Sequence, residues 1–247
     1  MAADGFKGVN LEKSSLRHVV FIVAHPDDVA FYMGGTAILL KDHYRLHVIC
    51  ASRGERGYAW DGPGRIPPNP ELACVREQEE REACAILGAS IEFLGVIDGD
   101  VYAERPVVEA VAKTLEALRP IAVLTHGPQE KPDHAGAFLI ALQALQKAGI
   151  FWDTELYMIV QYGTTTHGRY ADMYVNISEV IEQKRLLVAC HRSHHTEPNS
   201  VEHWIEPNAV FGRLAWCHYA EAFLTAHPPM ARRSGRKVGS ILMELEP

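Results

Sequence analysis

Residues that could bind a metal stand near the start of the chain, directly after an apolar run. The run at residues 19–23 (Val-Val-Phe-Ile-Val) is largely β-branched, which indicates a short strand buried on both faces. His25, Asp27 and Asp28 follow it around a proline. His25 and Asp28 are three residues apart on this turn, so both can reach one cation while Asp27 points elsewhere. Histidine nitrogen and carboxylate oxygen are ligands typical of zinc. The alternative is that one of the aspartates only caps the following helix.

Further polar residues follow two later runs that the sequence predicts to be strands. Asp98 comes after the run at 91–94. The run at 121–124 leads into a loop with four more candidates, which are His126, Lys131, Asp133 and His134. Because the carboxyl ends of parallel strands lie at one edge of a sheet, these residues can meet in one cleft although they are distant in sequence.

Three of these residues form a plausible ligand set. His25, Asp28 and His134 would supply two nitrogens and one oxygen. Three protein ligands leave an open position for water on zinc, which is the pattern of a catalytic rather than a structural site. Ferrous iron would accept the same ligands. The sequence therefore predicts a metal site, with zinc as the expected ion and ferrous iron as the alternative.

Predicted strands and helices alternate along the chain. Strands are expected at 46–51, 91–94, 121–124, 156–160 and 174–177, and helices at 71–87, 106–118, 135–147, 179–190 and 212–225. Asp133 is expected to cap the helix that starts at 135, and Ser178 the one at 179. The alternation implies a single α/β domain that is Rossmann-like, with a mainly parallel sheet flanked by helices.

Composition sets the class of protein. Hydrophobic residues make up 47% of the 247 residues, which is enough for a large core, and the net charge of −7 disfavours a nucleic-acid partner. The five cysteines show no Cys-x-x-Cys pair, which favours free thiols in a reducing compartment. No run is long enough to cross a membrane. We expect a cytoplasmic domain over 1–247, with a polar leader at 1–17, a tail segment at 226–247 and no membrane partner.

Two motifs resemble those of a known family. Ala-His-Pro-Asp-Asp at 24–28 with Gly-Gly-Thr at 34–36, together with the distant Pro-Asp-His at 132–134, resembles the PIG-L/LmbE-like family of zinc-dependent N-acetylglucosaminyl de-N-acetylases. The resemblance covers most of the chain. Supporting stretches are Arg53–Gly57, Arg76, Glu79-Glu80, Leu94–Gly99, Asn176–Ser178, Lys184, His191–His194 and Ala220–Phe223.

The resemblance implies a catalytic centre with defined roles. His25, Asp28 and His134 would bind zinc, and Asp27 would be the general base that takes a proton from zinc-bound water as the water attacks an acetamide carbonyl.

Two further positions match residues that contact sugar hydroxyls in the family. These are Asp98 and Arg76, although Arg76 could equally be an ordinary surface residue of its helix, paired with Glu80. Val29 stands where the family commonly has a glutamate, which would change the support around the ligands without removing the metal.

A second departure concerns the group that polarises or protonates during the reaction. Many members have a histidine where this chain has Lys131. Lys131 could offer a fixed positive charge to the oxyanion, but at its ordinary pKa of about 10.4 it is a poor proton shuttle. His126, or one of His191, His194 and His195, could take the acid role instead.

The expected reaction is removal of acetate from an N-acetylglucosamine unit of a small conjugate or oligosaccharide. The loops at 52–70 and 162–170 would then select what is attached to the sugar. One alternative, raised by Lys131, is a zinc amidohydrolase acting on an acyl amide that is not a sugar. Another is a Rossmann-like module that binds metal without catalysis. The expected partner is an N-acetylated sugar, and the resemblance also allows a homo-oligomer.

Overall fold

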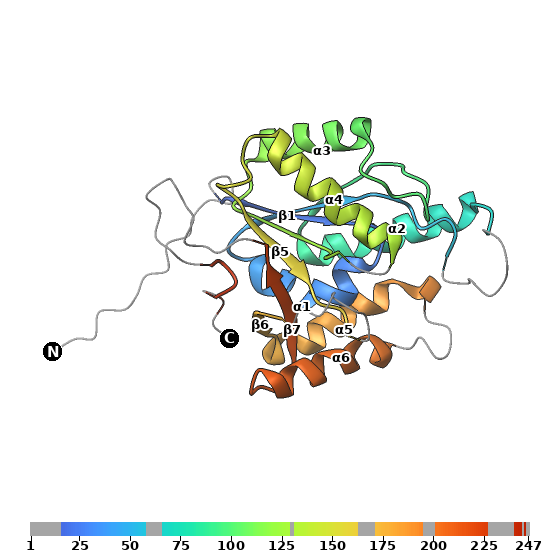
Figure 1. The fold of residues 1–247 in the computed structure, drawn as a ribbon. Coiled ribbons are helices and arrows are strands. Elements are labelled where there is room, and N and C mark those ends of the chain that lie inside the picture. Colours follow the sequence, from blue (N-terminus) through green and yellow to red (C-terminus); the bar gives the residue numbers. More distant parts are fainter. Residues whose placement is uncertain are drawn as a thin grey trace.

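The fold is built on one mixed sheet. The computed structural model describes residues 16–57, 66–128, 131–162, 171–194, 201–226, 240–243 and 245. Within these residues, seven strands form a sheet in the order β3-β2-β1-β4-β5-β7-β6 (Figure 1). The strands are β1 (His18–Val23), β2 (Arg45–Cys50), β3 (Ser90–Phe93), β4 (Ala122–Thr125), β5 (Glu155–Ile159), β6 (Met173–Asn176) and β7 (Ala220–Thr225). β1 to β5 are parallel, and β7 runs antiparallel to β5 and β6. The predicted α/β class with a mainly parallel sheet is confirmed.

Helices cover both faces of this sheet. They are α1 (Gly34–Leu40), α2 (Pro70–Leu87), α3 (Arg105–Leu118), α4 (Pro132–Lys147), α5 (Ile181–Cys190) and α6 (Val201–Leu214), with a π-helical turn η2 (Val29–Met33) and two 3-10 turns, η3 (Ser178–Val180) and η4 (Arg192–His194). Figure 1 shows α3 and α4 together on one side, and α1, α5 and α6 on the other. None of the helices in the described part of the chain is long and apolar enough to cross a membrane.

β1 explains why the first apolar run has no polar positions. Val19, Phe21 and Val23 pack into one hydrophobic core, whereas Val20 and Ile22 pack into the core beneath α3 and α4. Every one of these side chains is buried. A strand in the middle of a sheet that is covered on both faces needs apolar residues at consecutive positions rather than at alternate ones.

The direction in which the chain adds strands to the sheet reverses at β1. The chain builds β2 and β3 outward on one side of β1, then returns through α3 to place β4 on the other side. In such sheets, ligands bind outside the carboxyl ends of the strands where this reversal occurs. His25 follows β1 and His126 follows β4, so both lie at this point.

The predicted helix at 212–225 is wrong. α6 ends at Leu214, and Ala220–Thr225 forms β7, the strand between β5 and β6. Alanine, glutamate and leucine favour helices, but burial in the sheet overrides this weak preference. Glu221 is tolerated inside the strand because its carboxylate accepts hydrogen bonds from the Gly35 and Thr36 amides and from Lys184, each at 2.7–2.8 Å.

Candidate functional site

The turn after β1 is held by the carboxylate of Asp28. Its Oδ2 atom accepts hydrogen bonds from the backbone N–H groups of Ala24, at 3.1 Å, and His25, at 2.8 Å. The carboxylate therefore folds back toward the end of the strand and makes no capping hydrogen bond to the turn that follows. Asp28 is therefore not a helix cap. Its carboxylate faces His25 and His134 instead.

His25, Asp28 and His134 come together as the predicted ligand set. Asp28 Oδ2 lies 3.7 Å from His25 Nδ1, and Asp28 Oδ1 lies 3.4 Å from His134 Nε2. One ligand atom from each residue falls within 4.8 Å of the others. Two imidazole nitrogens and one carboxylate oxygen suit zinc or ferrous iron, so the residues present fit such an ion.

A pair of carboxylates fixes the ring of His25 from its other side. His25 Nε2 lies 3.1 Å from Asp133 and 3.2 Å from Asp98. Burial lowers the pKa of His25, but hydrogen bonds to Asp133 and Asp98 and the charge of Asp28 outweigh it and raise the pKa to about 10. Carboxylates that orient a ligating histidine in this way are common around metal sites.

Asp133 does not cap a helix, which corrects the prediction. α4 starts at Pro132, one turn earlier than expected, and Lys131 occupies the cap position. The carboxylate of Asp133 instead accepts a 2.6 Å hydrogen bond from the Gly99 N–H and contacts His25. Sequence reasoning missed this role, although the Pro-Asp-His motif contains the residue.

His126 lies behind the candidate ligand residues rather than in the cavity lining. It is fully buried, its Nε2 lies 2.9 Å from Asp28 Oδ2, and its ring stacks on His134 with centroids 3.9 Å apart. Burial and nearby His126 lower the pKa of His134 to about 3, which keeps His134 in the neutral form that can bind a metal. Burial would raise the pKa of Asp28, but His126 and His134 hold it well below its usual range.

Asp27 points away from Asp28 toward a different set of partners. Its Oδ2 atom lies 2.7 Å from Arg76 Nη2 and 2.9 Å from His194 Nε2, and its own N–H donates to Glu80 at 2.8 Å. Burial would raise the pKa of Asp27, but the charges of Arg76 and His194 lower it below its ordinary value. The backbone of Asp27 has φ = 101°, a strained conformation for a non-glycine residue that is typical of functional turns.

Arg76 is not a surface residue paired with Glu80. Its side chain is 95% buried and donates to the Gly54 carbonyl at 2.9 Å and the Pro26 carbonyl at 3.0 Å as well as to Asp27. Gly54 has φ = +64°, and a Cβ built there would lie 2.4 Å from the Arg76 guanidinium. The glycine therefore makes room for the arginine.

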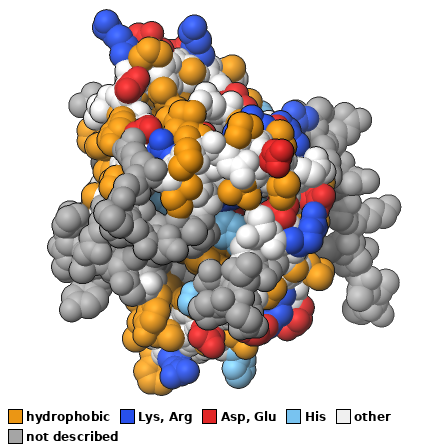
Figure 2. Space-filling model, turned by 90° about the vertical axis from the view of Figure 1, so that its right-hand side faces the viewer, with side chains coloured by type: hydrophobic (Ala, Val, Ile, Leu, Met, Phe, Trp, Pro, Cys, Tyr) orange, Lys and Arg blue, Asp and Glu red, His pale blue; other side chains and the backbone are white. Residues whose placement is uncertain are grey.

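A small cavity of about 150 Å³ collects these side chains. Its lining residues are His25, Asp27, Asp28, Tyr32, Gly57, Arg76, Asp98, Lys131 and His134. Seven residues that the sequence suggested for the site line it, whereas His126 and Asp133 do not: His25, Asp27, Asp28, Arg76, Asp98, Lys131 and His134. Figure 2, seen from the right-hand side of Figure 1, shows histidine side chains near the centre of that face. His25 has a side-chain exposure of 19%, so the cavity opens to solvent.

The remaining histidine candidates lie outside the cavity lining or outside the described residues. His194 does not line the cavity but contacts Asp27, and His191 lies 3.6 Å from Glu80, while His195 lies outside the described residues. Tyr32 also lines the cavity, although no sequence motif had pointed to it.

Fold and site together define an α/β protein with a candidate metal centre at the switch point of its sheet. The chain belongs to the GlcNAc-PI de-N-acetylase (PIG-L) family, whose model matches residues 20–145.

Curated relatives extend the match beyond that segment. The Bacillus cereus protein named probable N-acetyl-alpha-D-glucosaminyl L-malate deacetylase 2 is 28% identical over 190 residues, covering 72% of this chain and 83% of the relative. Diacetylchitobiose deacetylase of Thermococcus kodakarensis is 27% identical over 231 residues, covering 86% of this chain and 84% of the relative. Both names describe deacetylases of N-acetylated sugars.

The same fold also occurs in an enzyme whose name describes a hydratase rather than a deacetylase. The crystal structure of the 4-carboxy-2-hydroxymuconate hydratase of Pseudomonas putida superposes with a TM-score of 0.72 at 21% identity, covering 86% of this chain and 97% of the hydratase. At that identity the likeness concerns the fold alone, so the chemistry must be argued from the site.

Proposed function

We propose that this protein is a zinc-dependent hydrolase that removes the N-acetyl group from an N-acetylglucosamine unit of a small conjugate or oligosaccharide. The proposal rests on one observation. Asp27 lines the same cavity as the candidate metal ligands His25, Asp28 and His134. The names of the two deacetylase relatives support the same reaction and the same class of substrate.

The ligands for the metal would be His25, Asp28 and His134. A bound zinc ion supplies Lewis-acid activation of water and of the amide carbonyl, and ferrous iron is the alternative ion. His126 and Asp133 would act as positioning residues, because the first contacts Asp28 and the second contacts His25.

Asp27 would accept the proton of the attacking water. This role needs a carboxylate that stays ionised at neutral pH, and Arg76 and His194 favour that state. The same two contacts hold the side chain in one orientation within the cavity. His194 is behind Asp27 rather than in the lining, so we assign it a positioning role.

Lys131 would stabilise the oxyanion that forms when water attacks the carbonyl. It lines the cavity from the position just before α4, whereas His126 is fully buried beneath it. A fixed positive charge aimed at the developing oxyanion is a large catalytic contribution in a partly enclosed site. Asp98, which also lines the cavity, would accept hydrogen bonds from sugar hydroxyls.

The experiment combines metal analysis with a substrate panel. The full chain should contain one zinc per protein and release acetate from N-acetylglucosamine conjugates. Acetate release only from non-sugar amides would favour the amidohydrolase alternative, and zinc without any turnover would favour a binding module. Protein that binds neither zinc nor iron would refute the proposal. The control substrate is 4-carboxy-2-hydroxymuconate, because its hydration would point to the chemistry in the name of the structural relative.

Localisation belongs to the same proposal. All five cysteines are free thiols, which supports a reducing compartment such as the cytoplasm.

A further inference from the structure

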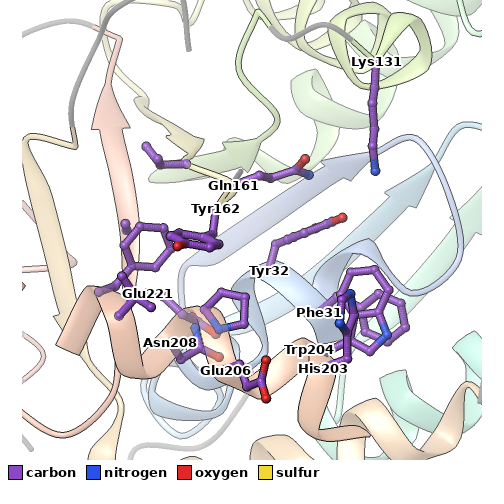
Figure 3. Close-up of a pocket in the computed structure, with 15 residues that line it drawn as sticks. Phe31, Tyr32, Lys131, Gln161, Tyr162, His203, Trp204, Glu206, Asn208 and Glu221 are labelled. Atoms are coloured by element: carbon purple, nitrogen blue, oxygen red, sulfur yellow. The ribbon is translucent and has the colours of Figure 1, made fainter. Parts of the chain in front are cut away.

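A second and larger cavity adjoins the candidate metal site. It has a volume of about 510 Å³, within the range of pockets that bind small molecules. Tyr32 and Lys131 line both cavities, so the two meet at these side chains. Figure 3 shows Lys131 reaching down from the helix above toward Tyr32. Gln161, which lines the larger cavity, contacts the ligand residue His134 at 3.2 Å.

The walls of the larger cavity are mainly apolar and aromatic. Trp204 of α6 stacks on Phe31 of η2, with centroids 4.0 Å apart and planes 12° from parallel (Figure 3). Tyr162 meets Phe211 edge to face at 6.3 Å on another side. Val210 adds an aliphatic surface on α6. Such walls match the flat faces and edges of an aromatic ring.

The buried polar residues that line the larger cavity offer no free charge. Glu221 lies there, but Lys184 and two backbone N–H groups already occupy its carboxylate. Asn208 donates its side-chain amide to the Ala220 carbonyl. Besides Lys131 and the paired Glu221, the charged residue of the lining is Glu206, which is exposed on α6, so the interior favours an uncharged occupant.

We propose that this cavity binds an apolar group, preferably an aromatic ring, that is part of the same molecule as the amide hydrolysed at the metal site. The inference rests on the proposed function, because it assigns a substrate class to that reaction. The substrate would bridge the junction at Tyr32 and Lys131, with its amide in the small cavity and its apolar group in the large one.

The apolar group could be carried on either side of the amide. It could be attached to the sugar, or it could be the acyl group itself. Two series of probes separate these sources. The first series is the methyl and phenyl β-glycosides of N-acetylglucosamine. The second is methyl β-glucosaminide carrying an N-acetyl or an N-benzoyl group. In one of the series, kcat/KM for the phenyl member should exceed that for the small member about tenfold or more.

A substitution that fills the cavity tests its location. Val210→Trp should reduce the preference for the phenyl probe, measured as the ratio of kcat/KM values, at least fivefold. Arg213→Trp places the same side chain on an exposed position of the same helix, outside the lining, and should leave that ratio unchanged. Circular dichroism and thermal unfolding establish that both variants are folded.

A binding measurement separates failure of this inference from failure of the proposed function. Phenyl β-glucosaminide and methyl N-benzoyl-β-glucosaminide are titrated calorimetrically into the full chain. The reference for the first is methyl β-glucosaminide, and the reference for the second is methyl N-acetyl-β-glucosaminide. Tighter binding of one phenyl compound, weakened by Val210→Trp and not by Arg213→Trp, supports the inference even if no amide is cleaved. Hydrolysis of the small sugars without any preference for a phenyl group in rate or binding would overturn the inference and leave the proposed function intact.

Discussion

The Nε2 atom of His194 lies 2.9 Å from Oδ2 of Asp27, so a residue of the late turn η4 holds the carboxylate of the first turn. His194→Gln removes a contact that lowers the pKa of Asp27. The acidic limb of the kcat/KM profile should therefore move to higher pH, and kcat should fall about 10–100-fold, as is typical when a supporting partner is lost. Metal content should stay the same. An unchanged pH profile would remove His194 from the site.

The roles of base and ligand can be separated by two substitutions. Asp27→Ala should keep one metal per chain, because Asp27 is not among the ligand residues, yet lower kcat about 10²–10⁴-fold. His134→Ala removes a ligand and should lower metal content. Metal analysis and acetate release on the same preparations give both readouts. Normal turnover by Asp27→Ala would show that the base has been assigned wrongly.

Lys131 should act through its charge. Lys131→Met should reduce kcat about 10²–10³-fold, the usual loss when one group that stabilises an oxyanion is removed. Lys131→Arg keeps the charge and should retain more activity, and Lys131→His introduces the residue common in the family. Steady-state kinetics of the three variants test the assignment. It is wrong if Met and Arg behave alike.

Metal binding should release about one proton per site near neutral pH. Without metal, His25 has a pKa of about 10 and is protonated, whereas His134, with a pKa of about 3, and Asp28 already lack protons. Affinity should therefore rise about tenfold per pH unit below pH 10 and level off above it. Calorimetry between pH 6 and 8 in buffers of different ionisation enthalpy measures the released proton. A pH-independent affinity would contradict this account of His25.

Gly54 should be needed for the position of Arg76. Gly54→Ala places a Cβ 2.4 Å from the guanidinium and also strains a backbone with φ = +64°. Gly88→Ala is the matched control, because φ is +62° and nothing lies within 4 Å of the added Cβ. Both should lose about 1–2 kcal/mol of unfolding free energy for the left-handed backbone. Only Gly54→Ala should also lose activity. Acetate release measures the activity of both variants, and urea unfolding measures their stability. Equal activities would mean that Arg76 adapts.

Much of the fold could be predicted because its signals are local. The apolar run of β1 indicated burial on both faces, and the alternation of strands and helices indicated a parallel sheet. β7 was not predictable in this way, because its alanines and glutamate favour a helix and only its place between β5 and β6 decides the outcome.

The candidate site divides in the same way. His25, Asp28 and His134 could be chosen from their residue types and strand-end positions. The contact between Asp133 and His25, and that between His194 and Asp27, depend on where α4 and η4 lie in space. The burial of Arg76 could not be predicted either. The spacing of residues along its helix does not show that Gly54, from another loop, packs against the guanidinium.

The order of strands at the antiparallel edge has a consequence for synthesis of the chain. β6 precedes β7 in sequence but joins the sheet only through it. On the ribosome, β6 therefore has no strand to pair with until Thr225 has emerged, long after β1 to β5 can associate. Glu221, which anchors the start of α1, arrives in the same late segment. A nascent chain stalled before residue 220 would hold all three candidate metal ligands while the helix beside them still lacks its anchor.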